Sequence, residues 1–147
     1  MKKTLTIILS YLLLIFNSNV KPDEDNKNLK IGLIAPLSGE YKELGNSLLY
    51  SLQLALSEIG DEDVFVIPRD SGFNNKDKLN SAIQDLRSQG VKVIIGPISF
   101  EDFDEVKKYS DITFISPSNI TPEFTNNIIS VGISLESQLS TIINFIK

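Results

Sequence analysis

The residues best suited to chemistry lie in short polar segments rich in serine, asparagine and glycine. Four such segments follow apolar runs, at Pro36–Tyr41, Arg69–Asn75, Pro97–Phe100 and Pro117–Pro122. Hydroxyl and amide groups are neutral donors and acceptors, which suit reversible binding of a ligand better than bond cleavage. Serine and asparagine are also ordinary N-caps and turn formers, so a purely structural role for Ser38, Ser99 and Ser118 is an equally good interpretation.

The sequence offers little for catalysis. It has no histidine and no cysteine, the side chains that most often supply a general base, a thiol nucleophile or a transition-metal ligand. Glu40 and Asp70 could pair as acid and base, but nothing fixes their separation and no nucleophile accompanies them. Asp70 could instead hold a ligand ammonium, although an aspartate that opens a turn is commoner. We expect no catalytic residue, no metal site and no cofactor.

Nucleotides and nucleic acids are poor partners for this sequence. Gly32 and Gly39, with Pro36 between them, match neither of the glycine-rich phosphate-binding patterns. The 147 residues include 14 lysines and arginines against 19 aspartates and glutamates, a net charge of −5. Because affinity for nucleic acid comes largely from basic side chains that neutralise phosphates, we expect no nucleic-acid partner.

The first 20 residues have the pattern of a secretory signal peptide. Two lysines precede an apolar run from Leu5 to Phe16, which is shorter than the roughly 20 residues of a transmembrane helix. An uncleaved membrane anchor is the alternative. Residues 21–28 are polar and typical of a linker. This organisation predicts an exported, periplasmic protein with a folded region at 29–147, which meets the membrane only through its signal segment.

Apolar runs alternate with helical stripes along the folded region. Short runs rich in branched residues predict buried strands at Leu29–Ala35, Val64–Ile67, Val91–Ile95, Ile112–Ile115 and Ile128–Ile133. Apolar stripes at helical spacing predict helices from Leu44 to Ile59, around Leu79 to Leu86, over Glu101–Tyr109 and from Leu135 onward. Gly60 and Gly90 are expected to end the first two helices, and Ser134 to cap the last.

This alternation predicts the α/β class, with a three-layer, mostly parallel, doubly wound sheet. In such a sheet the loops that lead from strand to helix emerge at the carboxyl edge, where ligands bind. The four polar segments are therefore expected to gather along one edge and to form the site.

Three stretches resemble the first lobe of type I periplasmic binding proteins: IGLIAPLSGEYKELGNSLLYSLQLALSEI, DSGFNNKDKLNSAIQDLRSQGVKVIIGPIS and FISPSNITPEF. The likeness runs from Lys30 to Lys147 and is greatest to the branched-chain amino-acid-binding (leucine-binding) group, which includes lipoprotein activators of cell-wall synthases. It implies a two-lobed receptor that closes over a small ligand. Only the N-terminal part of lobe 1 is matched, and the helix from Leu135 would lead toward the second lobe, so the resemblance implies an incomplete single lobe and a truncated chain.

The resemblance also implies which residues contact a ligand. The family's motifs place the predicted ligand-binding residues at Ser38, Gly39, Leu44, Ser99, Phe100, Ser118, Asn119 and Ile120. Two of them depart from the amino-acid binders, which usually have a hydroxyl where this chain has Phe100 and a threonine where it has Ile120. Many lipoprotein relatives carry a cysteine after the signal segment, and none occurs here.

These observations predict an exported solute-binding protein for an amino acid or a similar small polar metabolite, delivered to an ABC-type permease. The alternative is a non-transport envelope protein of the same fold that acts as activator or partner of a cell-wall synthase. An enzyme is not expected. In an incomplete lobe, Leu139 and Ile143 of the last helix should lack cover and leave an apolar patch exposed.

Overall fold

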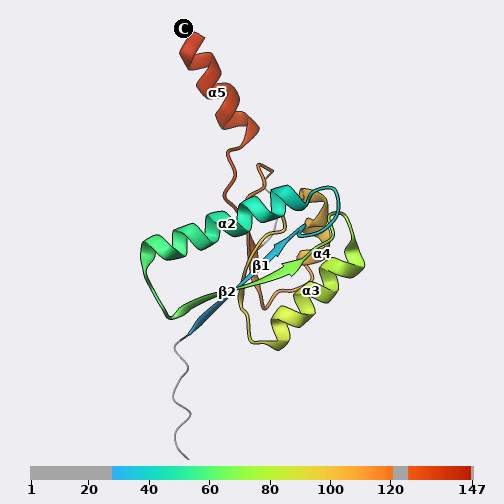
Figure 1. Cartoon of the computed structure of the whole chain (residues 1–147). Coiled ribbons are helices and arrows are strands. Elements are labelled where there is room, and N and C mark those ends of the chain that lie inside the picture. Colours follow the sequence, from blue (N-terminus) through green and yellow to red (C-terminus); the bar gives the residue numbers. More distant parts are fainter. Residues whose placement is uncertain (1–27, 121–125, 147) are drawn as a thin grey trace, which may run out of the picture.

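The computed structural model describes residues 28–120 and 126–146, which build a parallel sheet with helices on both faces (Figure 1). The strands are β1 (Leu29–Ala35), β2 (Val64–Asp70), β3 (Val93–Ile95), β4 (Thr113–Ser116) and β5 (Ile128–Ser130). The helices are α2 (Lys42–Ile59), α3 (Lys76–Ser88), the 3-10 turn η1 (Phe100–Asp102), α4 (Phe103–Val106) and α5 (Leu135–Ile146). The predicted signal peptide lies outside the described residues, as does nearly all of the linker.

The sheet is doubly wound. Its strand order is β2-β1-β3-β4-β5 and all four pairings are parallel. Ile31 of β1 is in register with Val66 of β2 on one side and with Val93 of β3 on the other. The first strand therefore lies inside the sheet, with β2 on one side and the later strands on the other, which confirms the predicted α/β class with a parallel, doubly wound sheet.

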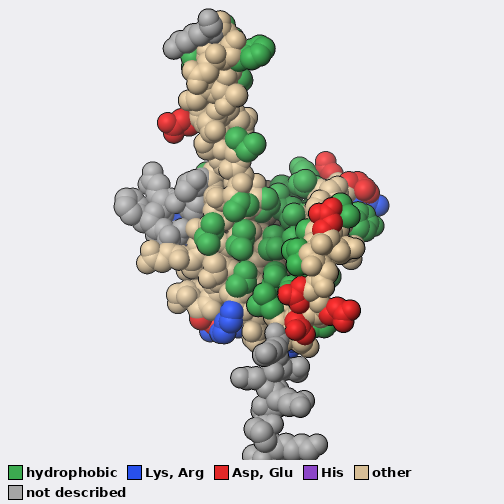
Figure 2. Space-filling model, turned by 90° about the vertical axis from the view of Figure 1, so that its left-hand side faces the viewer, with side chains coloured by type: hydrophobic (Ala, Val, Ile, Leu, Met, Phe, Trp, Pro, Cys, Tyr) green, Lys and Arg blue, Asp and Glu red, His purple; other side chains and the backbone are tan. Residues whose placement is uncertain are grey.

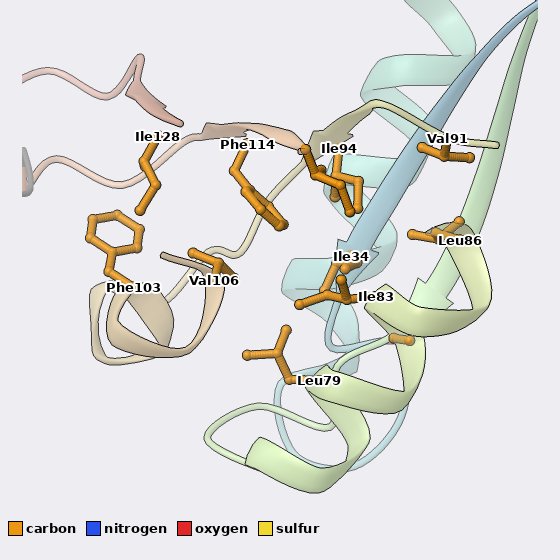
Figure 3. Packing of buried hydrophobic residues seen from close by; sticks show 12 residues of the cluster. Ile34, Leu79, Ile83, Leu86, Val91, Ile94, Phe103, Val106, Phe114 and Ile128 are labelled. Atoms are coloured by element: carbon orange, nitrogen blue, oxygen red, sulfur yellow. The ribbon is translucent and has the colours of Figure 1, made fainter. Parts of the chain in front are cut away.

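The core lies between the sheet and α3 with α4 (Figure 3). The predicted stripe of α3 is buried completely at Leu79, Ile83 and Leu86. Figure 3 shows Ile34 and Ile94 of the strands near these side chains. In the same view, Phe114 and Ile128 lie beside Phe103 and Val106 of α4. Helix α2 lies against the opposite face, over β1 and β2. Burial on both faces explains why the strands are nearly continuous apolar runs.

Two elements around the third strand differ from the prediction. The strand begins at Val93 instead of Val91, because the Val91 N–H donates to the Leu86 carbonyl oxygen at 3.2 Å in the turn after α3. The helix expected over Glu101–Tyr109 is instead η1 followed by the short α4. Phe103 and Val106 both reach the core within this one turn, so burial does not require a longer helix.

Three other strand boundaries move by a few residues. Strand β2 continues beyond the predicted Ile67 to Asp70, and β4 runs over Thr113–Ser116 instead of Ile112–Ile115. Strand β5 ends at Ser130 instead of Ile133. Its last pairing is Ser116 with Ser130, and Pro117 then turns the neighbouring chain away from the ladder.

The helix ends agree well with the sequence. Gly60 ends α2 in the left-handed conformation that glycine adopts at low cost. The Ser134 Oγ accepts the Ser137 N–H at 3.2 Å and so caps α5. Among the described residues, no helix is both long and apolar enough to cross a membrane.

Helix α5 projects from the sheet layers (Figure 1), and none of its described residues is buried. Leu139 is 49% exposed and Ile143 is 53% exposed, which confirms the expected uncovered helix face. Figure 2 shows further hydrophobic side chains gathered in a band on the body below this helix. On β5 and just after it, Ile129 and Val131 are more than half exposed.

Candidate ligand-binding site

The four polar loops meet at the carboxyl edge of the sheet and enclose an open hollow of about 340 Å³, here called the loop hollow. It is lined by Tyr41, Leu44, Phe73, Asn74, Ile98, Ser99, Phe100, Glu101, Ser118 and Asn119. Each of the four loops, or the first turn of the helix that follows it, contributes to this wall. The gathering of the loops along one edge is therefore confirmed.

Asp70 fixes the first loop to the second. Its Oδ1 accepts the N–H groups of Leu37 at 2.9 Å and Gly72 at 3.0 Å. Its Oδ2 accepts the Ser38 hydroxyl at 2.6 Å and the Lys78 ammonium at 2.7 Å. Partial burial raises the pKa of Asp70, but these hydrogen bonds outweigh it and hold the pKa well below its usual range. The carboxylate is fully engaged, so it serves as a turn-forming structural residue and not as a ligand contact.

Two further contacts bring the first loop close to its neighbours. The rings of Tyr41 and Phe73 stack with centroids 3.9 Å apart and an interplanar angle of 22°. Helix α2 lies so close to the first loop that a Cβ on Gly45 would be 2.1 Å from the Pro36 carbonyl oxygen. Only glycine permits this approach, which explains why a glycine occurs at this position of α2.

The third and fourth loops are joined by the buried Ser116. Its hydroxyl donates to the Pro97 carbonyl oxygen at 2.6 Å and accepts the Ser118 N–H at 3.1 Å. Gly96, at φ +113°, lies against the first strand, where a Cβ would be 2.2 Å from the Ile34 carbonyl oxygen. All four loops are therefore held by bonds between them and by close backbone packing, so the wall of the loop hollow is largely preformed.

Five of the predicted ligand-binding residues line the loop hollow: Leu44, Ser99, Phe100, Ser118 and Asn119. Ser38, Gly39 and Ile120 lie outside its lining. The Ser38 side chain is held by Asp70, and Gly39 is exposed in a left-handed turn at φ +78°. The Ile120 N–H donates to the Ser118 Oγ at 3.1 Å, and its carbonyl oxygen accepts the Ser130 hydroxyl at 3.0 Å.

Other lining residues were not predicted, namely Tyr41, Phe73, Asn74, Ile98 and Glu101. Tyr41 and Phe73 could have been predicted from the sequence, because each lies within or at the end of a glycine-containing polar loop. An aromatic ring in a loop at the carboxyl edge of a sheet is exposed by its position and is available to a ligand.

Two consecutive acidic residues follow the third loop. Glu101 lines the loop hollow and is exposed, whereas the next residue, Asp102, is 4% exposed. Burial raises the pKa of Asp102, and the nearby carboxylates of Glu101 and Glu105 raise it further, with partial relief from Lys76. Within the described part of the chain, no group of three or more acidic, histidine or cysteine side chains could hold a metal ion.

A family model described as periplasmic binding protein matches residues 28–147. The chain belongs to this family. Full-length LpoA from Haemophilus influenzae is similar in structure, with a TM-score of 0.63 and 22% identity over 80% of this chain and 21% of that one. Its C-terminal domain, described as a regulator of PBP1A, gives a TM-score of 0.59 and 20% identity over 80% of this chain and 38% of that one.

A solute-binding protein of an ABC transporter from Rhodopseudomonas palustris BisB5, in complex with 3,4-dihydroxybenzoic acid, gives a TM-score of 0.54. It is 21% identical over 63% of this chain and 27% of that one. No curated protein matches the chain at a significant level. The chain thus spans between a fifth and two fifths of these solved structures. The family and these structures comprise binding and regulatory proteins.

Proposed function

We propose that this periplasmic binding protein is an exported solute-binding protein that holds a small metabolite in the loop hollow and delivers it to an ABC-type permease. The observation that carries the proposal is the convergence of all four strand-to-helix loops on one hollow. Its volume of about 340 Å³ is within the range of small-molecule sites.

The composition of the wall also favours reversible binding. Hydroxyl and amide groups of Ser99, Ser118 and Asn119 supply hydrogen bonds, and the loops that carry them are already fixed to one another. A preformed wall lowers the ordering cost of binding. An amino acid, the ligand of the leucine-binding group, is one candidate metabolite, and Phe100 and Ile120 are the two departures from that group.

Titration of the isotope-labelled chain with a panel of amino acids, nucleosides, amides and aromatic acids tests this proposal. We expect at least one class to shift the amide resonances of Leu44, Ser99 and Ser118 saturably. The Leu86 resonance serves as an internal control because Leu86 lies near the C-terminal end of α3, at the opposite edge of the sheet from the loops. Saturable shifts at Leu86 without shifts at the loops, or no shifts with any compound, would contradict the proposal.

A second function is favoured by the exposed apolar helix α5. A helix with no buried residue offers a surface for a protein partner, and the regulator LpoA shares the fold. In this alternative the protein acts as activator or partner of a cell-wall synthase in the envelope. Affinity capture from envelope extracts with the tagged protein separates the two roles, since the first predicts recovery of a permease and the second recovery of a synthase.

A further inference from the structure

Three aromatic rings, each from a different loop, line the loop hollow. Tyr41 ends the first loop, Phe73 lies in the second and Phe100 ends the third. Phe100 is 50% exposed and Tyr41 is 43% exposed. Aromatic rings pack favourably against other rings, and a half-exposed ring at a preformed hollow leaves part of its surface for a ligand.

The charges around the hollow select against an anion. Glu101 is the one charged side chain in its lining, and no lysine or arginine among the described residues lines it. The Asp70 carboxylate lies outside the lining and is occupied by four donors. A ligand carboxylate would therefore meet Glu101 without a compensating cation, which raises the cost of binding.

The hydroxyl groups of Ser99 and Ser118 can donate to a ligand. The Ser99 Oγ already accepts the Glu101 N–H at 3.2 Å, and the Ser118 Oγ accepts the Ile120 N–H at 3.1 Å. Each hydroxyl thus keeps its own proton for another acceptor. The matching group on a ligand is a hydrogen-bond acceptor such as an amide or ketone oxygen or a ring nitrogen.

From these three observations we infer that the loop hollow takes an uncharged aromatic ligand that carries a hydrogen-bond acceptor. The inference rests on the proposed function, because it names the ligand class of the same site. It assigns two specificity roles. The Phe100 ring packs against the ligand ring, and the Glu101 carboxylate disfavours anionic analogues of the same shape.

Three probes of nearly equal size separate these features. Benzamide has the ring and the neutral acceptor, benzoate exchanges the amide for a carboxylate, and cyclohexanecarboxamide keeps the amide but loses the aromatic ring. Amide chemical shifts of the full labelled chain give the dissociation constant of each probe. We expect benzamide to bind about fivefold more tightly than cyclohexanecarboxamide, from ring packing. We expect it to bind about fivefold more tightly than benzoate, from the charge on Glu101.

Matched variants assign the two effects to residues. Phe100→Ser should weaken benzamide about fivefold and remove its advantage over cyclohexanecarboxamide. Phe65→Ser is the control, because Phe65 is 48% exposed on β2 and does not line the hollow, and it should leave all three constants unchanged. Glu101→Gln should bring benzoate to within about twofold of benzamide.

The outcomes are distinguishable. If cyclohexanecarboxamide or benzoate binds at the four loops as tightly as benzamide, the ligand class is wrong, although a binding site remains. Binding of leucine or another aliphatic amino acid at these loops, with no response to benzamide, overturns the inference and leaves the proposed function standing. If neither the three probes nor the wider metabolite panel shifts the loop resonances, the inferred ligand class and the proposed function are both wrong.

Discussion

The Asp70 carboxylate accepts the Leu37 backbone N–H at 2.9 Å, across a sequence separation of 33 residues. This bond joins the end of β2 to the loop that follows β1, so the first two loops of the site have a fixed relative position. The same carboxylate caps its own turn at Gly72 and binds Ser38 and Lys78. The relative position of the first two loops therefore depends on one side chain that does not line the hollow.

Replacing Asp70 by alanine should lower the free energy of unfolding by about 2 kcal/mol at neutral pH, because hydrogen bonds to a charged acceptor are lost and backbone donors lose their partner. Urea denaturation measures this change. Glu40→Ala is the control, since Glu40 is exposed and has no hydrogen bond or ion pair to the described residues. Equal effects of the two substitutions would show that Asp70 does not hold the loops.

The pH dependence of the Asp70 contribution has a definite sign. Because the folded state lowers the pKa of Asp70, its contribution is fully present above the ordinary pKa of an aspartate, about 3.9, and is lost as the pH falls toward the folded value. The stability difference between wild type and Asp70→Ala should be constant from pH 7 to pH 5 and should shrink below about pH 4. A difference that grows on acidification would contradict this assignment.

Gly45→Ala should destabilise the protein, although the same substitution usually stabilises a helix. At an ordinary helical position alanine stabilises by about 1 kcal/mol relative to glycine. Here the added Cβ would be 2.1 Å from the Pro36 carbonyl oxygen, so α2 or the loop must move. We expect a loss of about 2–3 kcal/mol in thermal or urea unfolding. Ser57→Ala, at an exposed position of the same helix, should change stability by less than about 0.5 kcal/mol.

Much of the fold follows from local patterns. The bounds of β1, the glycine end of α2 and the Ser134 cap of α5 were predicted because each depends on residues within one or two turns. The start of β3 was predicted too early. Val91 is apolar and buried, as a strand residue would be, but it lies in the turn after α3. Burial alone does not distinguish the two conformations.

The site was predictable at the level of loops and less so at the level of side chains. Parallel topology places the four loops together, and no long-range information is needed for that step. Ser38 lies outside the hollow because Asp70, distant in sequence, accepts its hydroxyl. The stacking of Tyr41 on Phe73 likewise depends on the relative position of the first and second loops. Such contacts arise from the three-dimensional arrangement and have no local sequence signal.

Asp102→Asn should stabilise the protein at neutral pH. Burial and the neighbouring Glu101 and Glu105 carboxylates raise the pKa of Asp102, so its charged form is less favourable in the folded state than in the unfolded chain. Because the pKa of Asp102 is raised, the stability that this group contributes is fully present below the ordinary pKa of an aspartate, near pH 4. This contribution is lost as the pH rises through the pKa of Asp102 in the folded state. We therefore expect a higher thermal midpoint for the variant at pH 7 and little difference at pH 3.

The matched control for this substitution is Asp104→Asn, whose side chain is 89% exposed and pairs with Lys107 on the surface. Exposed ion pairs contribute little, so its midpoint should stay close to that of the wild type at both pH values. A destabilised Asp102→Asn variant at pH 7 would mean that the charged carboxylate makes a favourable contact that outweighs its burial.

Helix α5 should contribute little to the stability of the body. Its residues Leu139 and Ile143 are about half exposed, and none of its described residues is buried. Leu139→Ser should therefore change the free energy of unfolding by less than about 0.5 kcal/mol, and it should reduce the fluorescence of a dye that binds exposed apolar surface. Leu79→Ala, in the core under α3, should by contrast cost about 2–5 kcal/mol. If the two substitutions destabilise equally, α5 packs against the body in solution and the apolar surface is not available to a partner.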